Sequence, residues 1–312
     1  MEFAALSLKD SYLAAQQLAR RRMPHLYRVA RLFEERDRFM AFCAAYASMR
    51  WVDDLIDEGR HTEDELSGWE EEIEGNFAGR AGCSEYGPAL TDTLSRFAIS
   101  REPWIRLASA MRYDAQHHSF GTYQSFLDYA EGATVAPASV FAALLLMRPA
   151  GNGFAPALPF SRIRDAVRAS AIGCYEVHIL RDAKMDLEVG RNYFPRDELE
   201  RYHLQESTAL SEKWRPYLRA YAMRTRGGWD PGLGDLHSLE APMTAREKLM
   251  LRLLVEFYGR SLRKIMRLNC NVWEDVHWPE VEEVRVLLQE LAARYEPGVD
   301  LDALAVRVVE DV

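Results

Sequence analysis

The 312-residue sequence predicts an all-α protein, and three of its features lead to that fold class. Apolar residues recur at three- and four-residue spacing over long segments, which is the pattern of a helix with one buried face. Runs of alternating apolar and polar residues between turn pairs, which would indicate strands, are absent from the sequence. Glycine and proline gather in short stretches between the periodic segments. We therefore expect one helical domain over residues 1–312, with long helices around a common centre.

The expected helices follow from this periodicity in chain order. It is clearest in four segments, Phe39–Ile56, Ser161–Leu187, Arg246–Leu268 and Val281–Tyr295. The stretch "EDELSGWEEEIEG" predicts a solvated acidic helix, and "ATVAPASVFAALLLM" is broken by Pro137 and too short to span a bilayer. Breaks between helices are expected at "AGRAGCSEYGP", "REP", "RPAGNGFAPALPFS", "YFPRDEL", "RGGWDPGLGD" and "LEAP".

Composition narrows the class of protein. Hydrophobic residues make up 48 % of the chain and charged residues 28 %, which is typical of a globular protein with a sizeable core. The formal net charge of −9 argues against a nucleic-acid partner, because such proteins carry a basic surface. Four widely spaced cysteines and an N-terminus without signal-peptide features predict reduced thiols and a cytoplasmic location. An anionic substrate would need local cations to be held.

The stretch "MRWVDDLIDE" places four acidic residues within six positions, at the end of a mostly apolar helix. Asp53 and Asp57 are four residues apart, so they stack on one helix face. At about 100° per residue, two residues that precede them share that face, Tyr46 and Arg50. Alone, such a pair of aspartates usually marks a solvated helix end.

A second pair with the same spacing lies in "GCYEVHILRDAKMDLEVGRNYFP". Here Asp182 and Asp186 share one helix face with Tyr175 and His178. If the two helices face each other, four carboxylates converge. A buried cluster of like charges is costly unless cations compensate it, and Mg²⁺ binds one or two carboxylates together with waters and substrate phosphates. The pattern therefore predicts a Mg²⁺-bound diphosphate, with guanidinium groups placed to bind phosphate at Arg50, Arg181 and Arg191.

These motifs resemble those of the squalene/phytoene synthase family of head-to-head prenyl transferases. Tyr46-x-x-x-Arg50-x-x-Asp53-Asp54-x-x-Asp57 is similar to the first aspartate motif of the family. The stretch "ILRDAKMDLEVGRNYFP" is similar to the second motif, including the arginine before the first aspartate and the Gly-Arg-x-Tyr-x-Pro that follows. "TYQSFLDYAEGATVAPAS" resembles the tyrosine-containing segment between them, and the resemblance runs from about Tyr27 to Leu268.

The resemblance implies the all-α isoprenoid synthase fold, with helices around an apolar cavity. It implies a Mg²⁺-dependent condensation of two prenyl diphosphates, farnesyl or geranylgeranyl, through a cyclopropylcarbinyl diphosphate to a C30 or C40 isoprenoid such as squalene or phytoene. Asp53, Asp57, Asp182 and Asp186 would ligate Mg²⁺ against diphosphate. The family's substrate-binding positions correspond to Tyr46, Arg50, Tyr175, His178, Arg181, Arg191, Tyr193 and, in a late helix, Tyr258.

Tyr129 matches a tyrosine of the family and is expected either to line the cavity as a catalytic residue or to be a core tyrosine with a satisfied hydroxyl. The sequence leaves NADPH use open, because family members that make squalene use NADPH without a glycine-rich nucleotide motif. It also leaves the oligomeric state open. A very apolar product is compatible with peripheral contact with a membrane.

The sequence departs from the family pattern in three places. Tyr175 and His178 stand where the family usually has glutamine and asparagine. The N-terminal serines of the diphosphate-binding segment are missing from "MPHLYR", where His25, Tyr27, Arg28 or Arg31 would have to substitute. Pro137 lies where a glycine-rich turn is common. These changes leave two alternatives open, an enzyme that ionises one prenyl diphosphate to cyclise or hydrolyse it, and an inactive helical binding subunit.

Overall fold

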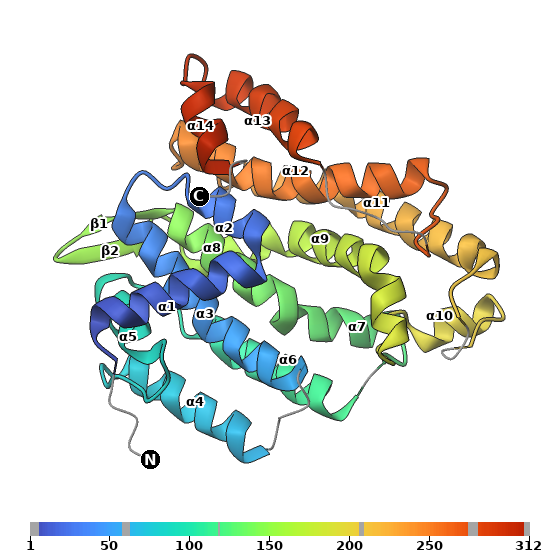
Figure 1. The fold of residues 1–312 in the computed structure, drawn as a ribbon, viewed down its shortest axis with the longest axis horizontal. Coiled ribbons are helices and arrows are strands. Elements are labelled where there is room, and N and C mark those ends of the chain that lie inside the picture. The colour runs from blue at the N-terminus through green and yellow to red at the C-terminus, as the bar shows by residue number, and fades with distance from the viewer. Residues whose placement is uncertain (1–5, 58–62, 118, 206–208, 274–279, 309–312) are drawn as a thin grey trace.

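The structure is a computed structural model that describes residues 6–57, 63–117, 119–205, 209–273 and 280–308 (Figure 1). The side chain of Asp57, one of the four aspartates expected to bind metal, lies outside the described residues. The helices are α1 (Leu8–Arg22), α2 (Pro24–Ala30), α3 (Arg36–Asp57), α4 (Glu63–Phe77), α5 (Gly87–Arg96), α6 (Glu102–Gln116), α7 (Tyr123–Ala130), α8 (Ala136–Leu145), α9 (Phe160–Glu188), α10 (Arg196–Arg201), α11 (Arg215–His237), α12 (Ala245–Arg267), α13 (Val281–Tyr295) and α14 (Leu301–Val308). A π-helical segment spans Glu131–Val135 and a 3₁₀ turn spans Glu212–Trp214.

The predicted all-α class is confirmed. All four segments with clear apolar periodicity form helices, namely α3, α9, α12 and α13. Capping residues and first-turn prolines determine where several of the helices begin. Thr122 and Thr244 form capping boxes at the starts of α7 and α12, and each satisfies backbone N–H groups that a helix start leaves without a partner. Proline occupies the first turn of α2, α5, α6 and α8, where its missing N–H costs nothing.

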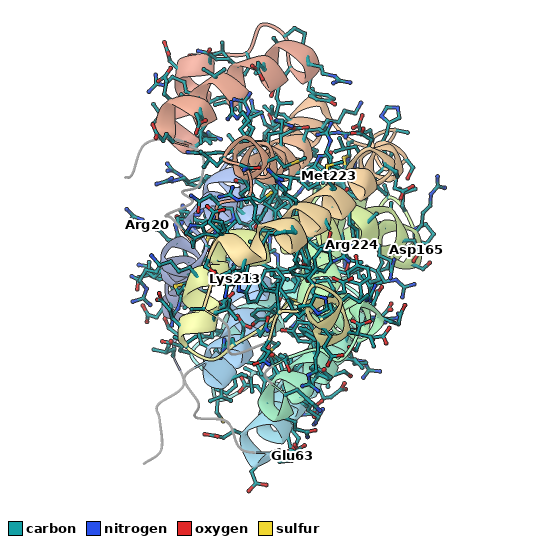
Figure 2. All side chains as sticks on the ribbon, turned by 90° about the vertical axis from the view of Figure 1, so that its right-hand side faces the viewer. Arg20, Glu63, Asp165, Lys213, Met223 and Arg224 are labelled. Atoms are coloured by element: carbon teal, nitrogen blue, oxygen red, sulfur yellow. The ribbon has the colours of Figure 1, made fainter. Side chains whose placement is uncertain are left out.

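The helices surround a centre formed by α3, α8, α9 and α12. Helix α11 packs along α9, α1 and α5 cover α3, and α13 lies on α12. Figure 1 shows α4 and α5 at one end of the molecule and α13 and α14 at the other, with α14 beside α2. Figure 2 shows α11 crossing the face turned toward the viewer, with Met223 and Arg224 on it. Among the described residues, none of the helices combines the length and the apolar character needed to cross a membrane.

Two local features differ from the expectation, a β-hairpin and one helix break. Strands β1 (Met147–Ala150) and β2 (Gly153–Pro156) pair antiparallel within a stretch where the sequence predicts a loop. Their two-residue connection begins with Gly151 at φ 57°, and glycine adopts such a conformation without steric cost. The break expected at "RGGWDPGLGD" is wrong, because α11 continues through Pro231. Packing along α9 outweighs the roughly 3 kcal/mol that proline costs inside a helix.

The helix expected to be a solvated acidic helix, α4, is amphipathic. Leu66, Trp69 and Ile73 are buried on one face of it, and the indole of Trp69 donates a hydrogen bond of 3.0 Å to the carbonyl oxygen of Ser48 on α3. The acidic residues of α4 cover only its outer face. This helix therefore supports α3, which carries the first pair of aspartates.

Candidate active site

A cavity of about 690 Å³ lies between α2, α3, α8, α9 and α12. Most of its wall is apolar, and Phe42 and Phe141 are among its buried residues. One end is polar and partly exposed to solvent, and it carries Arg50, Asp53 and Asp182. An apolar cavity with a few convergent polar groups is the usual form of a small-molecule site.

Tyr46, Arg50 and Asp53 lie on one face of the C-terminal half of α3 and form the first of two polar stripes. Arg50 forms an ion pair with Asp53 and hydrogen-bonds Asp54, with 2.7 Å between Nε of Arg50 and Oδ1 of Asp54. Asp54 also accepts a hydrogen bond of 3.0 Å from Arg22. Burial alone would lower the pKa of Arg50, but the two neighbouring carboxylates outweigh it and raise the pKa above its ordinary value. The guanidinium therefore balances the acidic cluster at the end of α3.

Tyr175, His178, Asp182 and Asp186 lie on one face of α9 and form the second polar stripe. Asp182 accepts hydrogen bonds from Arg181, and Nε2 of His178 lies 2.8 Å from its Oδ2. Burial would raise the pKa of Asp182, but the bonds from Arg181 and His178 hold that pKa well below its ordinary value. Asp182 is thus a carboxylate at neutral pH. Asp186 lies one turn further along and also lines the cavity.

Three tyrosines face the cavity next to the acidic stripes. The ring centroid of Tyr175 lies 6.4 Å from that of Tyr129 and 6.2 Å from that of Tyr193. Burial raises the pKa of each of these phenols, so all three are protonated at neutral pH. The hydroxyl of Tyr129 donates to Asp114 at 3.1 Å, so Tyr129 lines the cavity and also has a satisfied hydroxyl. Electron-rich ring faces in this position can stabilise a cation.

Helix α2 supplies His25, one of the substitutes considered for the missing serines. Nε2 of His25 lies 3.3 Å from the hydroxyl of Tyr258 on α12, and both residues line the cavity. Burial lowers the pKa of His25 to about 3, and the neighbouring groups Arg181, His178 and Arg28 contribute to the shift. The imidazole is therefore neutral at pH 7 and offers hydrogen bonds without a charge.

The structure places twelve of the thirteen expected site residues in the wall of one cavity, and the side chain of the thirteenth, Asp57, lies outside the described residues. The cavity wall contains Tyr46, Arg50, Asp53, Tyr129, Tyr175, His178, Arg181, Asp182, Asp186, Arg191, Tyr193 and Tyr258. The two polar stripes therefore line one cavity. Sequence reasoning missed the apolar wall residues, including Val284 of α13 and Val308 of α14, because no motif marks a residue that joins a site through tertiary packing alone.

The carboxylates suit a hard cation such as Mg²⁺. Within the described part of the chain, no group of three or more acidic, histidine or cysteine side chains is close enough to enclose a metal ion. Mg²⁺ needs no such cage, because it usually keeps several waters and binds one or two carboxylates plus substrate phosphates. The oxygen donors of Asp53, Asp182 and Asp186, on two sides of one cavity, fit that mode of binding.

Comparisons with known proteins agree with this arrangement. The model of the family described as squalene/phytoene synthase matches residues 19–282. The 15-cis-phytoene synthase of Synechocystis sp. is 29 % identical over 195 residues, which cover 60 % of this chain and 57 % of that protein. The chloroplastic phytoene synthase of Narcissus pseudonarcissus is 29 % identical over 229 residues, which cover 70 % and 52 %. The match thus spans just over half the length of these two relatives.

Solved structures show the fold. A dehydrosqualene synthase in complex with a ligand superposes with a TM-score of 0.76 at 15 % identity, over 92 % of this chain and 97 % of that one. Squalene synthase HpnC from Alicyclobacillus acidocaldarius superposes with a TM-score of 0.69 at 24 % identity, over 85 % and 96 %. Helices that are far apart in the sequence are therefore arranged in this chain as they are in those two proteins.

Proposed function

The chain belongs to the squalene/phytoene synthase family and has the isoprenoid synthase fold, and from this premise we propose that it is a prenyl transferase. It condenses two prenyl diphosphates, farnesyl or geranylgeranyl, head to head through a cyclopropylcarbinyl diphosphate to a C30 or C40 isoprenoid such as squalene or phytoene. The observation that carries the proposal is the apolar cavity with carboxylates and guanidinium groups from α3 and α9 at one end.

In this proposal Asp53, Asp182 and Asp186, together with Asp57, would hold Mg²⁺. The bound metal supplies Lewis-acid stabilisation of the departing diphosphate. Arg181 and Arg191 bind phosphate oxygens, and Arg50 positions Asp53.

The rest of the cavity protects the cation that forms when diphosphate departs. Its apolar wall excludes water, which would otherwise capture that cation. The rings of Tyr129, Tyr175 and Tyr193 lie beside the carboxylates and present electron-rich faces. Tyr46 and Tyr258 lie in the wall near the guanidinium groups and complete the substrate-binding end.

A second candidate is an enzyme that ionises only one prenyl diphosphate and cyclises or hydrolyses it. The observation that favours it is His25, a buried neutral imidazole on the helix where the family's serines are missing. A single neutral imidazole offers a diphosphate fewer hydrogen bonds than several serine hydroxyls would. The third alternative, an inactive binding subunit, conflicts with the cost of keeping like-charged carboxylates together at a cavity.

The test is product analysis by mass spectrometry after incubation with Mg²⁺ and farnesyl or geranylgeranyl diphosphate, with and without NADPH. A C30 or C40 product supports condensation, whereas a C15 or C20 product with released pyrophosphate supports the second candidate. The NADPH arm decides the use of that cofactor. Fractionation of the active protein with lipid vesicles tests the expected peripheral contact with membranes.

Variants connect the activity to the site. Asp53→Asn and Asp182→Asn are expected to abolish both turnover and the Mg²⁺-dependent thermal stabilisation by pyrophosphate. Asp165→Asn is the matched control, because Asp165 lies on α9 with an exposed side chain and does not line the cavity (Figure 2). Equal stabilisation in all four proteins would contradict the assignment of the aspartates.

A further inference from the structure

Two tyrosine hydroxyls lead from the cavity to a carboxylate behind its wall. Tyr175 of α9 and Tyr129 of α7 line the cavity, whereas Asp114 of α6 does not. The hydroxyl of Tyr129 donates to Oδ2 of Asp114 at 3.1 Å. Helix α7 contacts both α6 and α9, so the three side chains come from neighbouring helices (Figure 1). They connect the cavity with an acidic group that does not line it.

The hydroxyls of Tyr175 and Tyr129 are also linked, and the link has a direction. Burial raises the pKa of both phenols, and a hydrogen bond between the two side chains adds to the rise at Tyr129 and opposes it at Tyr175. A phenol has a single proton, and Tyr129 gives its proton to Asp114, so Tyr175 donates to Tyr129. The phenol of Tyr175 also interacts with the charge of Asp53, which comes from α3 on the other side of the cavity. Tyr175 is therefore the end of the chain that faces the cavity.

Neighbouring rings hold both phenols in place. The ring of Tyr175 stacks on Phe126 with 6.0 Å between the centroids and an angle of 12°, and it meets Tyr193 edge-on at 6.2 Å. The ring of Tyr129 lies 5.1 Å from that of Phe120. Aromatic contacts of this kind favour one ring orientation. The hydroxyls are thus ordered before a substrate binds, and no reorganisation is needed at the moment of reaction.

Asp114 has a route to solvent. Together with His117 and Arg191 it lines a second, small cavity of about 30 Å³. A cavity of that volume can hold a water molecule. Asp114 is partly exposed and His117 is exposed. A proton that reaches Asp114 can therefore leave the protein there, without returning through the apolar cavity.

Tyr175 distinguishes this chain from the usual family pattern. It stands where the squalene/phytoene synthase family usually has glutamine. A phenol has an oxygen that accepts a proton and a hydroxyl proton that it can pass on, whereas a neutral amide is a much weaker acid and only exchanges hydrogen bonds. The residue at this position therefore decides whether a proton in the cavity can reach Tyr129 and Asp114.

We propose that Tyr175, Tyr129 and Asp114 form a relay that removes the proton lost by the final cation, so that the product is an unreduced isoprenoid. The inference rests on the proposed function, because that cation arises from the condensation. A C–H bond next to the cationic carbon breaks, and its electron pair forms a C=C bond. The proton binds the oxygen of Tyr175, whose own proton passes to Tyr129. The proton of Tyr129 passes to Asp114, which acts as the general base.

The relay determines which product forms. Loss of a proton neutralises the cation without a hydride donor. The product therefore has one C=C bond more, and two hydrogen atoms fewer, than a product formed by hydride transfer. The structure thus assigns this chain to the enzymes whose product is unreduced, with an NADPH-independent last step.

The test compares hydrocarbon formation with pyrophosphate release, because diphosphate departs before the proton is lost. The full-length protein is incubated with Mg²⁺ and farnesyl or geranylgeranyl diphosphate, with and without NADPH. The wild type is expected to give the same unreduced product in both arms. Tyr175→Phe and Asp114→Asn should still release pyrophosphate, but should form hydrocarbon about a hundredfold more slowly, the lower end of what a positioned base contributes. Alcohols from capture of the cation by water should increase.

A purely structural role would lower both rates together, so the separation of the two rates is the diagnostic result. Asp114→Glu keeps the carboxylate and should recover most of the hydrocarbon yield. Because the relay acts as a unit, the double variant Tyr175→Phe/Asp114→Asn should lose no more than either single variant. If Asp114→Asn does not fold, as judged by circular dichroism, Tyr175→Phe and Tyr129→Phe decide the question, since each removes a single oxygen.

Neighbouring residues provide matched controls. Tyr113→Phe removes the same hydroxyl from a ring whose centroid lies 5.8 Å from that of Tyr129, but Tyr113 donates to the carbonyl oxygen of Ser119 and does not line the cavity. Asp128→Asn removes an exposed carboxylate from α7 that accepts a hydrogen bond from Gln124. Both variants should form as much hydrocarbon per pyrophosphate as the wild type.

Three results would overturn the inference, and they differ in what they leave standing. A wild-type product that forms only with NADPH, or an unchanged hydrocarbon yield per pyrophosphate in folded Tyr175→Phe and Asp114→Asn, rejects the relay but leaves the condensation intact. In the second case another base, such as the departed diphosphate, takes the proton. A wild-type protein that forms no coupled product rejects the proposed function and the relay with it.

Discussion

Nε2 of His178 lies 2.8 Å from Oδ2 of Asp182, one helical turn further along α9. Asp182 is one of the expected Mg²⁺ ligands, and His178 is four residues before it on the same helix face. Asp182 also accepts hydrogen bonds from Arg181, so two donors orient the same carboxylate. Groups that orient a metal ligand typically change metal affinity or activity by 10- to 100-fold when they are removed.

Removing the imidazole should therefore weaken Mg²⁺ binding. His178→Leu is expected to raise the Mg²⁺ concentration for half-maximal activity, and for half-maximal thermal stabilisation by pyrophosphate, by about tenfold. His178→Gln keeps a hydrogen-bond donor and should lie closer to the wild type. A leucine variant with the Mg²⁺ dependence of the wild type would show that Arg181 alone orients Asp182.

The parts of this site that could be predicted from the sequence are those that follow from helix geometry. Residues four apart share a face, so the spacing alone places the pairs Asp53–Asp57 and Asp182–Asp186 on two stripes. The family resemblance then places the two stripes opposite each other. The long helices could be predicted for the same reason, because each carries a clear apolar period.

The rest depends on tertiary packing or on short local signals. Pro231 predicts a break, but packing of α11 on α9 keeps the helix continuous. The Gly151-Asn152 pair at the hairpin turn is visible in the sequence, although the strands it joins are only four residues long. Val308 has no local signal at all, since only the packing of α14 against α2 brings it to the cavity.

The neutral state of His25 should appear in the pH dependence of stability. Its pKa is lowered to about 3 in the folded protein, from 6.5, by burial and by the facing groups Arg181, His178 and Arg28, and Tyr258 is its hydrogen-bond partner. Below pH 6.5 the unfolded chain binds a proton that the folded protein does not. The stability contributed by the neutral imidazole is therefore full above pH 6.5 and is lost as the pH falls toward 3.

The expected loss from this one group is at most about 2 kcal/mol between pH 7 and pH 5. Urea unfolding of the wild type and His25→Asn at both pH values measures it, and the variant should lose less stability over this interval. Parallel curves for the wild type and His25→Asn would show that His25 is not held neutral.

Arg224 joins three elements behind the active site. Its guanidinium pairs with Glu198 of α10, its Nε lies 3.7 Å from Oε1 of Glu176 of α9, and its Cζ lies 3.8 Å from the ring centre of Tyr123 of α7. Glu176 is buried next to Tyr175 of the cavity wall, and burial raises its pKa. Removing the cation leaves Glu176 with the hydroxyl of Tyr123 and Glu198 with the hydroxyl of Tyr217, but takes the positive charge of Arg224 from both carboxylates.

Arg224→Met is therefore expected to cost on the order of 3 kcal/mol of stability in urea unfolding at pH 7. This figure is at the lower end for buried pairs, because 31 % of the arginine side chain is exposed. The deficit should shrink at lower pH as Glu176 becomes protonated. Arg219→Met on the same helix removes an exposed contact with Asn269 and should cost less than about 1 kcal/mol. If Arg224→Met loses no more stability than Arg219→Met, the contacts of Arg224 with Glu198, Glu176 and Tyr123 do not stabilise the fold.

Gly132 allows α6 and the π-helical segment to pack closely beside the cavity. A Cβ atom at this position would overlap the carbonyl oxygen of Arg106 and lie 2.7 Å from Cβ of Ala110, both on α6. Backbone atoms cannot rotate away, so Gly132→Ala must push the segment off α6, and overpacking of this kind typically costs about 1–3 kcal/mol. The segment also carries Ala133 and Thr134 of the cavity wall, so kcat/KM should fall together with the melting temperature.

Gly228→Ala on α11 is the control, because its Cβ would meet nothing within 4 Å and alanine is the better helix former by about 1 kcal/mol. Because the same substitution should destabilise one helical segment and stabilise the other, a Gly132→Ala protein as stable as the wild type would show that α6 and the π-helical segment can separate at no cost.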